Sequence, residues 1–161
     1  MPPATTVKLV ISSEVRLVDV VHTASETMAG IAGFEEDDAL NVGIAVREAV
    51  INAVLHGNRM DPSRKVEVNL QARPRSIRAR VRDQGAGFDS GATPDPTVGD
   101  NLMRSSGRGL LVMRAFVDKV EFKFLEGRGM EVTLLKKSSA RKTTRSARPA
   151  VAAMDNGGIE R

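Results

Sequence analysis

The sequence predicts an α+β fold, a two-layer α/β sandwich in which helices cover one face of a mixed, mainly antiparallel sheet. Hydrophobic residues make up 41% of the 161 positions, which is enough for one folded domain with a core. Segments that alternate polar and apolar residues, typical of strands, come in clusters and do not alternate one by one with helical segments. Five Phe are the only aromatic residues, so we expect an aliphatic core.

The first half of the chain predicts one strand and two helices. Alternation over residues 5–11 indicates a strand, and apolar positions at helical spacing indicate a helix over residues 13–30. The segment from Glu35 to Gly57 is the clearest helix. Four acidic residues, Glu35 to Asp38, favour the positive end of its dipole, and Gly57 stands where a C-terminal cap belongs.

The second half predicts the rest of the sheet. Residues 65–72 and 76–83 alternate as two strands joined by a turn, residues 109–119 have helical spacing, and residues 120–126 and 129–137 form a closing hairpin. Between residues 83 and 108 Gly and Pro replace any regular pattern, which indicates a functional loop or a mis-assigned element. We therefore predict a folded domain at residues 1–137 and a basic, disordered tail at residues 138–161.

Composition and charge exclude several classes of protein. The absence of Cys excludes disulfide scaffolds, thiolate metal centres and a Cys nucleophile. No apolar stretch approaches 18 residues, so we expect no membrane span and a cytoplasmic protein. Seven of the 24 basic residues, but only two of the 20 acidic ones, lie between Lys136 and Arg161. The tail is thus the basic part, and we expect no nucleic acid partner beyond weak contact by the tail.

Three features of the sequence carry chemical groups, and the first is Glu48-x-x-x-Asn52 with His56 four residues further on. Steps of four place these polar side chains on roughly one face of an otherwise apolar helix. A polar stripe on such a helix is costly to bury unless it meets a ligand or a water-filled cleft. The alternative is that Glu48 and Asn52 face solvent or cap a neighbouring turn.

The second feature is the run Asp83-Gln84-Gly85-Ala86-Gly87, directly after a predicted strand. A carboxylate at a strand end can accept a hydrogen bond from an exocyclic amine, and the two glycines let the backbone approach a planar ring. Taken alone, the same pattern is an ordinary turn signal.

The third feature is Ser106-Gly107-Arg108-Gly109, which opens the predicted helix at residue 109. Glycines before a helix expose backbone N–H groups at the positive end of the dipole, which suits an anion. Arg108 and Arg104 add positive charge for phosphate oxygens. The run is neither a P-loop nor a dinucleotide fingerprint, and alone it could be a simple helix cap.

Together, these motifs resemble a known family. The segments EAVINAVLHG, DQGAGFD and SGRGLLVM resemble the N-box and the two glycine boxes of the GHKL ATPase/kinase superfamily. The small size and the G-R-G-L-x-x-M form of the last box resemble its branch of anti-sigma-factor serine/threonine kinases. The resemblance covers roughly residues 7–137 and implies the GHKL ATPase fold, a histidine-kinase-like ATP-binding domain.

The resemblance implies roles for the residues of the first two motifs. Glu48 would be the catalytic general base, and Asn52 would coordinate Mg²⁺ that bridges the phosphates of ATP. Asp83 would bind the adenine amino group, with Gly85 and Gly87 beside the base.

The third motif would bind the phosphates through Gly107, Arg108 and Gly109, below a lid at about residues 88–106. In this branch an arginine directly precedes the Ser-Gly of the lid. Here Ser105 has that position, and Arg104, the candidate phosphate ligand, comes one residue earlier.

The function implied is an ATP-dependent serine/threonine protein kinase that is also an anti-sigma factor. It would phosphorylate an anti-sigma factor antagonist protein, sequester a sigma factor and form a homodimer. The displaced arginine keeps a second hypothesis open, a nucleotide-binding regulatory protein that binds partners without phosphoryl transfer.

Overall fold

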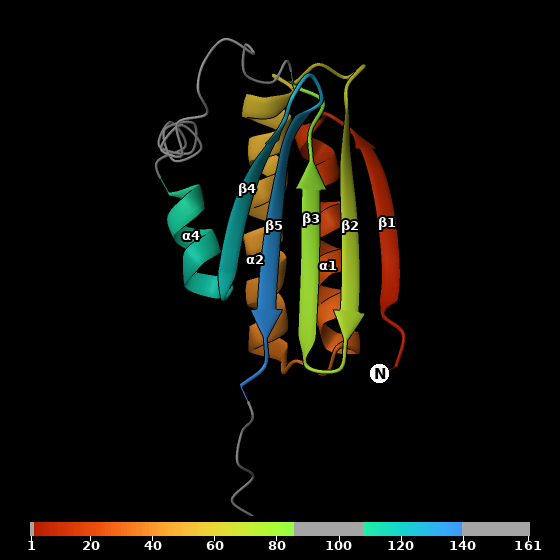
Figure 1. Cartoon of the computed structure of the whole chain (residues 1–161), viewed down its shortest axis with the longest axis vertical. Helices are drawn as coiled ribbons and strands as arrows, with labels where there is room; N and C mark the ends of the chain where they lie inside the picture. The colour runs from red at the N-terminus through yellow and green to blue at the C-terminus, as the bar shows by residue number, and fades with distance from the viewer. Residues whose placement is uncertain (1, 86–107, 140–161) are drawn as a thin grey trace, which may run out of the picture.

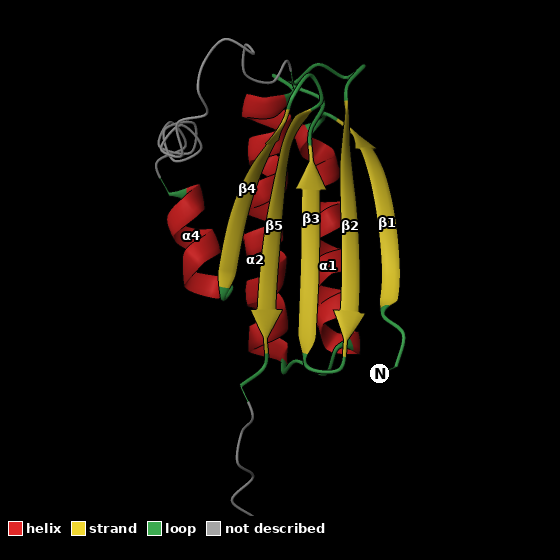
Figure 2. Cartoon of the chain, in the orientation of Figure 1, coloured by secondary structure: helices red, strands yellow, loops and turns green. Residues whose placement is uncertain are grey.

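The computed structural model describes residues 2–85 and 108–139 of the chain. One five-stranded sheet has the order β1-β2-β3-β5-β4, and all four neighbouring pairs are antiparallel. The strands are β1 (Thr5–Ser12), β2 (Lys65–Arg73), β3 (Ser76–Arg82), β4 (Lys119–Leu125) and β5 (Gly129–Lys137). The helices lie on one face of this sheet (Figures 1 and 2), so the predicted α+β sandwich is confirmed.

The helical layer is built around α2 (Glu36–Asn52), which contacts both α1 (Val18–Ile31) and α4 (Gly109–Phe116). A short 3₁₀ helix, η1 (Val15–Leu17), leads into α1, and a π-helix, η2 (Ala53–Gly57), continues α2. By length and apolar composition the stretch Glu36–Gly57 could cross a membrane, but 56% of its apolar window is buried inside the protein. It is the central core helix of the domain.

Two predicted helix boundaries were wrong. The helix expected from Ser13 begins at Val15, because Ser13 is buried and its hydroxyl donates to the Arg64 carbonyl oxygen at 2.7 Å. The helix expected to reach Lys119 ends at Phe116. Val117 adopts extended backbone angles, and Asp118 N–H donates to the Leu135 carbonyl at 2.9 Å, so the chain has already joined the sheet.

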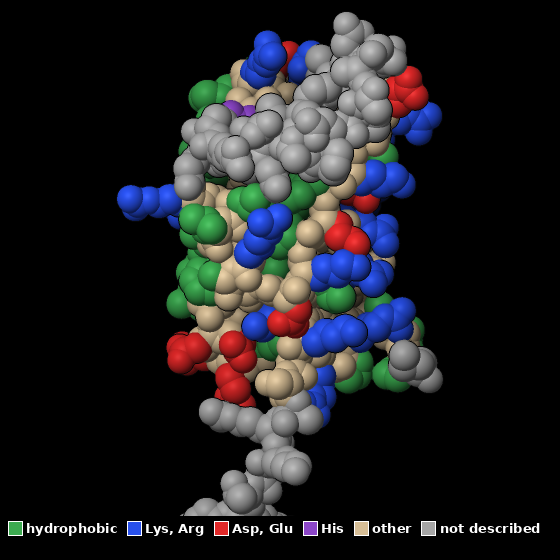
Figure 3. Space-filling model, turned by 60° about the vertical axis from the view of Figure 1, so that its left-hand side comes forward, with side chains coloured by type: hydrophobic (Ala, Val, Ile, Leu, Met, Phe, Trp, Pro, Cys, Tyr) green, Lys and Arg blue, Asp and Glu red, His purple; other side chains and the backbone are tan. Residues whose placement is uncertain are grey.

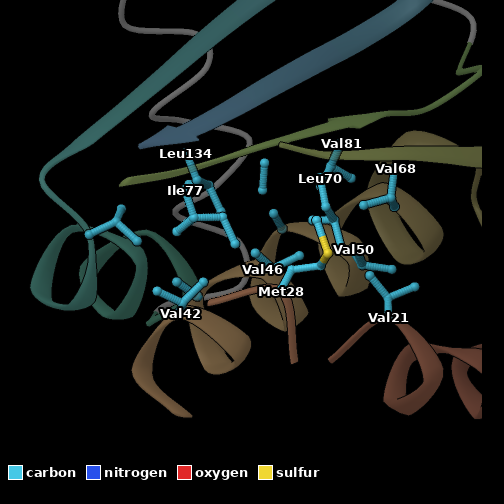
Figure 4. Close-up of a cluster of buried hydrophobic side chains, with 14 of the residues drawn as sticks. Val21, Met28, Val42, Val46, Val50, Val68, Leu70, Ile77, Val81 and Leu134 are labelled. Carbon is cyan, nitrogen blue, oxygen red and sulfur yellow. The ribbon is translucent and has the colours of Figure 1, made fainter. Parts of the chain in front are cut away.

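The core is aliphatic, as the composition predicts, and lies between the helices and the sheet (Figure 4). Alternation along β2 and β3 turns every second side chain toward the helices, where it leaves water. The labelled core residues come from α1 (Val21, Met28), α2 (Val42, Val46, Val50) and the sheet (Val68, Leu70, Ile77, Val81, Leu134). This packing fixes α2 against β3, the two elements that carry the predicted site.

Charge is separated between the two layers, although the folded part is nearly neutral in sum. Strand alternation places on the open face of the sheet the basic residues Lys8, Lys65, Arg73, Arg78, Arg80, Arg82, Lys119, Lys123 and Lys137, with Glu67, Glu121 and Glu131. The helices α1 and α2 carry one basic residue, Arg47, and six acidic ones: Asp19, Glu26, Glu36, Asp37, Asp38 and Glu48. Figure 3 shows Lys and Arg gathered along its right-hand side and acids at its lower left. The open face of the sheet is therefore a basic surface within a folded part whose net charge is close to zero.

Candidate functional site

One end of the sandwich brings together the end of α2, the end of β3 and the β4–β5 hairpin (Figure 1). Asp83, directly after β3, is only 3% exposed there. Its backbone N–H donates to the Met130 carbonyl at 3.0 Å, and its Oδ1 accepts from the N–H groups of Gly85 (2.9 Å) and Met130 (3.1 Å). None of the described residues donates to Oδ2.

Three glycines pack against Asp83 and leave no room for a side chain. A Cβ on Gly57 would collide with the Asp83 carboxylate, and one on Gly85 would collide with the Gly57 carbonyl. At Gly129 a Cβ would collide with the backbone carbonyl of Asp83, and φ of +93° is itself unfavourable for other residues. The sequence singled out Gly85 as a place where the backbone approaches a planar ring, whereas Gly57 and Gly129 were predicted only as a helix cap and a hairpin residue.

Burial raises the pKa of the Asp83 carboxyl group. The hydrogen bonds from Gly85 and Met130, and the positive charge of Arg64, oppose that rise without cancelling it. An ionised carboxylate in this position is poorly solvated, and the described residues fill only part of its hydrogen-bonding capacity. A ligand amine that donates to Oδ2 would therefore stabilise the ionised form, which is the adenine role that the sequence predicts.

The α2 stripe is realised only in part. Glu48 is half-buried, and Asn52, one turn further on, is 3% exposed at the last residue of α2. The helix then widens into the π-turn of η2, where Asn58 N–H donates to the Ala53 carbonyl at 2.8 Å. His56 lies within this π-turn and is exposed. Such π-turns occur frequently at functional sites.

The phosphate motif is described only at its C-terminal end. Gly109 is buried at the start of α4, and Arg108 before it is exposed, with its carbonyl accepting from Val112 N–H at 3.0 Å. The first amides of α4 have no partners within the helix, which suits an anion. Gly87, Arg104 and Gly107 lie outside the described residues, as does the predicted lid, so their roles stay predictions.

Asn58 is a buried polar residue that the sequence analysis missed. Its amide Nδ2 donates to Ser13 Oγ (2.8 Å) and to the Lys65 carbonyl (3.0 Å), and its Oδ1 accepts from Gln84 N–H at 2.7 Å. These partners are up to 45 positions away in sequence. An Asn after a helix-ending Gly is an ordinary turn signal, and no local pattern could reveal such contacts.

The donor groups of α2 suit magnesium in kind. Within residues 2–85 and 108–139 there is no cluster of three or more His, Cys, Asp or Glu able to hold a metal ion alone. Mg²⁺ commonly takes one or two protein oxygens together with phosphate and water oxygens. The amide of Asn52 and the carboxylate of Glu48, one helical turn apart, offer oxygens of that kind, so the residues present fit a metal held jointly with a nucleotide.

The buried strand-end carboxylate, the glycines around it and the polar residues of α2 lie together at one end of an α+β sandwich. The chain belongs to the histidine kinase-like ATPase family, because the model of that domain matches residues 11–136. Membership of an ATPase family makes ATP the nucleotide expected at this site.

Relatives of known name match most of the folded part. The anti-sigma F factor of Oceanobacillus iheyensis is 31% identical over 110 residues, which are 66% of this chain and 75% of the relative. The anti-sigma F factor of Geobacillus stearothermophilus is 32% identical over 111 residues, 67% of this chain and 75% of the relative. That of Clostridium perfringens (strain SM101) is 31% identical over 104 residues, 63% and 74% of the two chains.

Proposed function

We propose that this protein is an ATP-dependent serine/threonine protein kinase that acts as an anti-sigma factor in the cytoplasm. It phosphorylates an anti-sigma factor antagonist protein and, as a homodimer, sequesters a sigma factor. The similarity to several anti-sigma F factors supports the sigma-factor partner. The resemblance of the three motifs to the kinase branch supports the serine/threonine specificity.

The observation that carries the proposal is the state of Asp83. Its Oδ1 is held by two backbone amides, while its Oδ2 has no donor among the described residues and lies against Gly57. A single buried acceptor beside glycine backbone recognises a planar base with an exocyclic amine, as adenine has. The ionised form of this buried carboxyl group gains most from such a donor.

The chemistry would take place beside α2. Glu48 removes the proton from the Ser or Thr hydroxyl of the antagonist, whose oxygen attacks the γ-phosphorus of ATP. The bond between the γ-phosphorus and the bridging oxygen breaks, and ADP leaves. Asn52 would hold Mg²⁺, which when bound neutralises phosphate charge, and the first amides of α4 with Arg108 would bind phosphate oxygens.

The test is transfer of labelled γ-phosphate to candidate antagonist proteins by wild type, Glu48→Gln and Asn52→Ala. A general base acts mainly in the transition state, so Glu48→Gln should retain ATP binding while turnover falls about 10²–10⁴-fold. Asn52→Ala should weaken both, because it disturbs the metal that organises the phosphates. Calorimetry of ATP binding accompanies each rate measurement.

Glu36→Gln is the matched control, since it removes the same charge from α2 but at the opposite end of the helix. It should leave both binding and turnover unchanged. Wild-type turnover by Glu48→Gln would contradict the assignment of the base. A wild-type protein that binds ATP and a sigma factor but labels no antagonist would favour the nucleotide-binding regulator without phosphoryl transfer.

A further inference from the structure

Asn58 lies at the junction of four segments around the end of the sheet. Its side chain is fully buried, at 0% exposure, just after the π-turn that ends at Gly57. Its three hydrogen bonds reach Ser13 after β1, Lys65 at the start of β2 and Gln84 after β3. Both amide protons and one lone pair of its oxygen are thus in use, so the side chain has a single well-defined orientation.

The side-chain amide of Asn58 takes the place of a backbone peptide group between β2 and the residues after β3. The last regular pair between β2 and β3 is Glu67 with Arg82. Beyond it, Gln84 N–H donates to Asn58 Oδ1 at 2.7 Å and Asn58 Nδ2 donates to the Lys65 carbonyl at 3.0 Å, as a peptide group of an intervening strand would do. Lys65 N–H donates in turn to Gln84 Oε1 at 2.6 Å. The ladder therefore continues through side chains past the end of β3.

This continuation holds the turn that carries the ligand-binding carboxylate. Gln84 is the middle residue of a turn that is closed by the hydrogen bond from Gly85 N–H to Asp83 Oδ1. On one side the turn is bound by backbone hydrogen bonds between Asp83 and Met130 of β5. On the other side, Asn58 is the one side chain among the described residues that accepts from the Gln84 amide.

We infer that Asn58 is a positioning residue of the nucleotide site, which sets the direction of the Asp83 carboxylate and so the preference for a base with an exocyclic amine. The inference rests on the proposed binding of ATP. Without the Asn58 acceptor, the Gln84 backbone N–H loses its partner, and on the β2 side the Asp83–Gly85 turn is held only through the Gln84 side chain, whose Oε1 accepts from Lys65 N–H. The loss should therefore appear in base selectivity as well as in stability.

The experiment compares ATP with inosine triphosphate, which has a carbonyl oxygen where adenine has its amine. Calorimetry gives both affinities for the full-length wild type, Asn58→Ala and Asn58→Asp. Partial unfolding lowers both affinities by the same factor, so the ratio of the two reports on the site alone. We expect the ratio to fall about tenfold in Asn58→Ala. The fall should be smaller in Asn58→Asp, which keeps an oxygen for the Gln84 amide although its second oxygen then faces the Lys65 carbonyl.

Ser13→Ala is the matched control within the same network. It removes one of the two partners of Asn58 Nδ2 and the bond to the Arg64 carbonyl but leaves the Lys65 and Gln84 contacts in place. Its stability should fall in urea while its ATP to inosine triphosphate ratio stays that of wild type. An unchanged ratio in Asn58→Ala, or an equal loss in Ser13→Ala, would overturn the positioning role. A wild type that binds ATP and inosine triphosphate equally would instead overturn the adenine assignment of Asp83, and the positioning role with it.

Discussion

At the scale of single residues, Asp83 combines poor solvation with a capacity for specific binding. A carboxyl group whose pKa is raised by burial binds its proton more tightly in the folded protein than in the unfolded chain. Its ionisation therefore lowers the stability of the folded protein at neutral pH. The same poorly solvated carboxylate is a strong hydrogen-bond acceptor for a ligand. Function and stability are opposed at this position.

We expect Asp83→Asn to weaken ATP binding about 10–100-fold without lowering the stability of the nucleotide-free protein. Asn keeps an oxygen for the Gly85 and Met130 amides but has no charge to bury. Because the folded pKa is raised, the Asp83 term stabilises the fold below the ordinary pKa and fades as the pH rises through the folded pKa. Urea unfolding of both proteins from pH 3 to 7 should therefore show wild type losing stability relative to the variant as the pH rises. A variant as tight for ATP as wild type would disprove the adenine contact.

Sequence patterns single out residues whose chemistry has a local signature and do not single out residues whose contacts are distant in sequence. Asp83 and Gly85 follow a strand in a recognisable run, and Glu48 and Asn52 are polar on an apolar helix. Asn58 gave no such signal, because its partners come from three other segments. The π-turn that contains His56 was not predicted, because the spacing of side chains does not distinguish one π-turn from an α-turn.

At the scale of elements, alternation and helical spacing predicted every described strand and α-helix. The errors lay at ends, where tertiary hydrogen bonds decide. The β4–β5 hairpin shows what a pattern alone leaves out. Gly127 and Gly129 both have positive φ, but Gly127 has open space beside it, whereas Gly129 lies against the Asp83 backbone. Gly127 is thus required only by the turn, whereas Gly129 is also required by the close contact with Asp83.

Alanine at these two glycines should separate the two roles. Gly127→Ala bears only the cost of a left-handed backbone, about 1–2 kcal/mol of unfolding free energy, and should bind ATP normally. Gly129→Ala also displaces the Asp83 carbonyl, so we expect a loss of more than about 3 kcal/mol, together with weakened ATP binding. Urea unfolding and calorimetry measure both. Equal effects of the two substitutions would mean that the close approach to Asp83 is without consequence.

At the scale of the whole molecule, near neutrality conceals an open sheet face rich in cations and a helical layer rich in acids. Within this face the neighbours of each arginine differ. Arg80 stands between Arg78 and Arg82 along β3, and its cross-strand partners are the uncharged Asn69 and Thr133. Arg82, two residues on, has the acidic cross-strand partners Glu67 and Glu131. Side chains that alternate on one strand face are about 7 Å apart, so like charges there repel.

Reversal of charge at these two positions should therefore have opposite effects. Arg80→Glu replaces repulsion from Arg78 and Arg82 with attraction, and we expect it to raise the thermal midpoint in low salt by about 1–4 °C. Arg82→Glu places three carboxylates side by side and should lower the midpoint by a similar amount. Both shifts should shrink in 1 M salt, where the screening length falls to about 3 Å. The two substitutions are made on the same strand and the same face, and both replace Arg with Glu. Shifts of the same sign, or shifts that persist in 1 M salt, would show that strand propensity or packing, and not charge, determines the change in thermal midpoint.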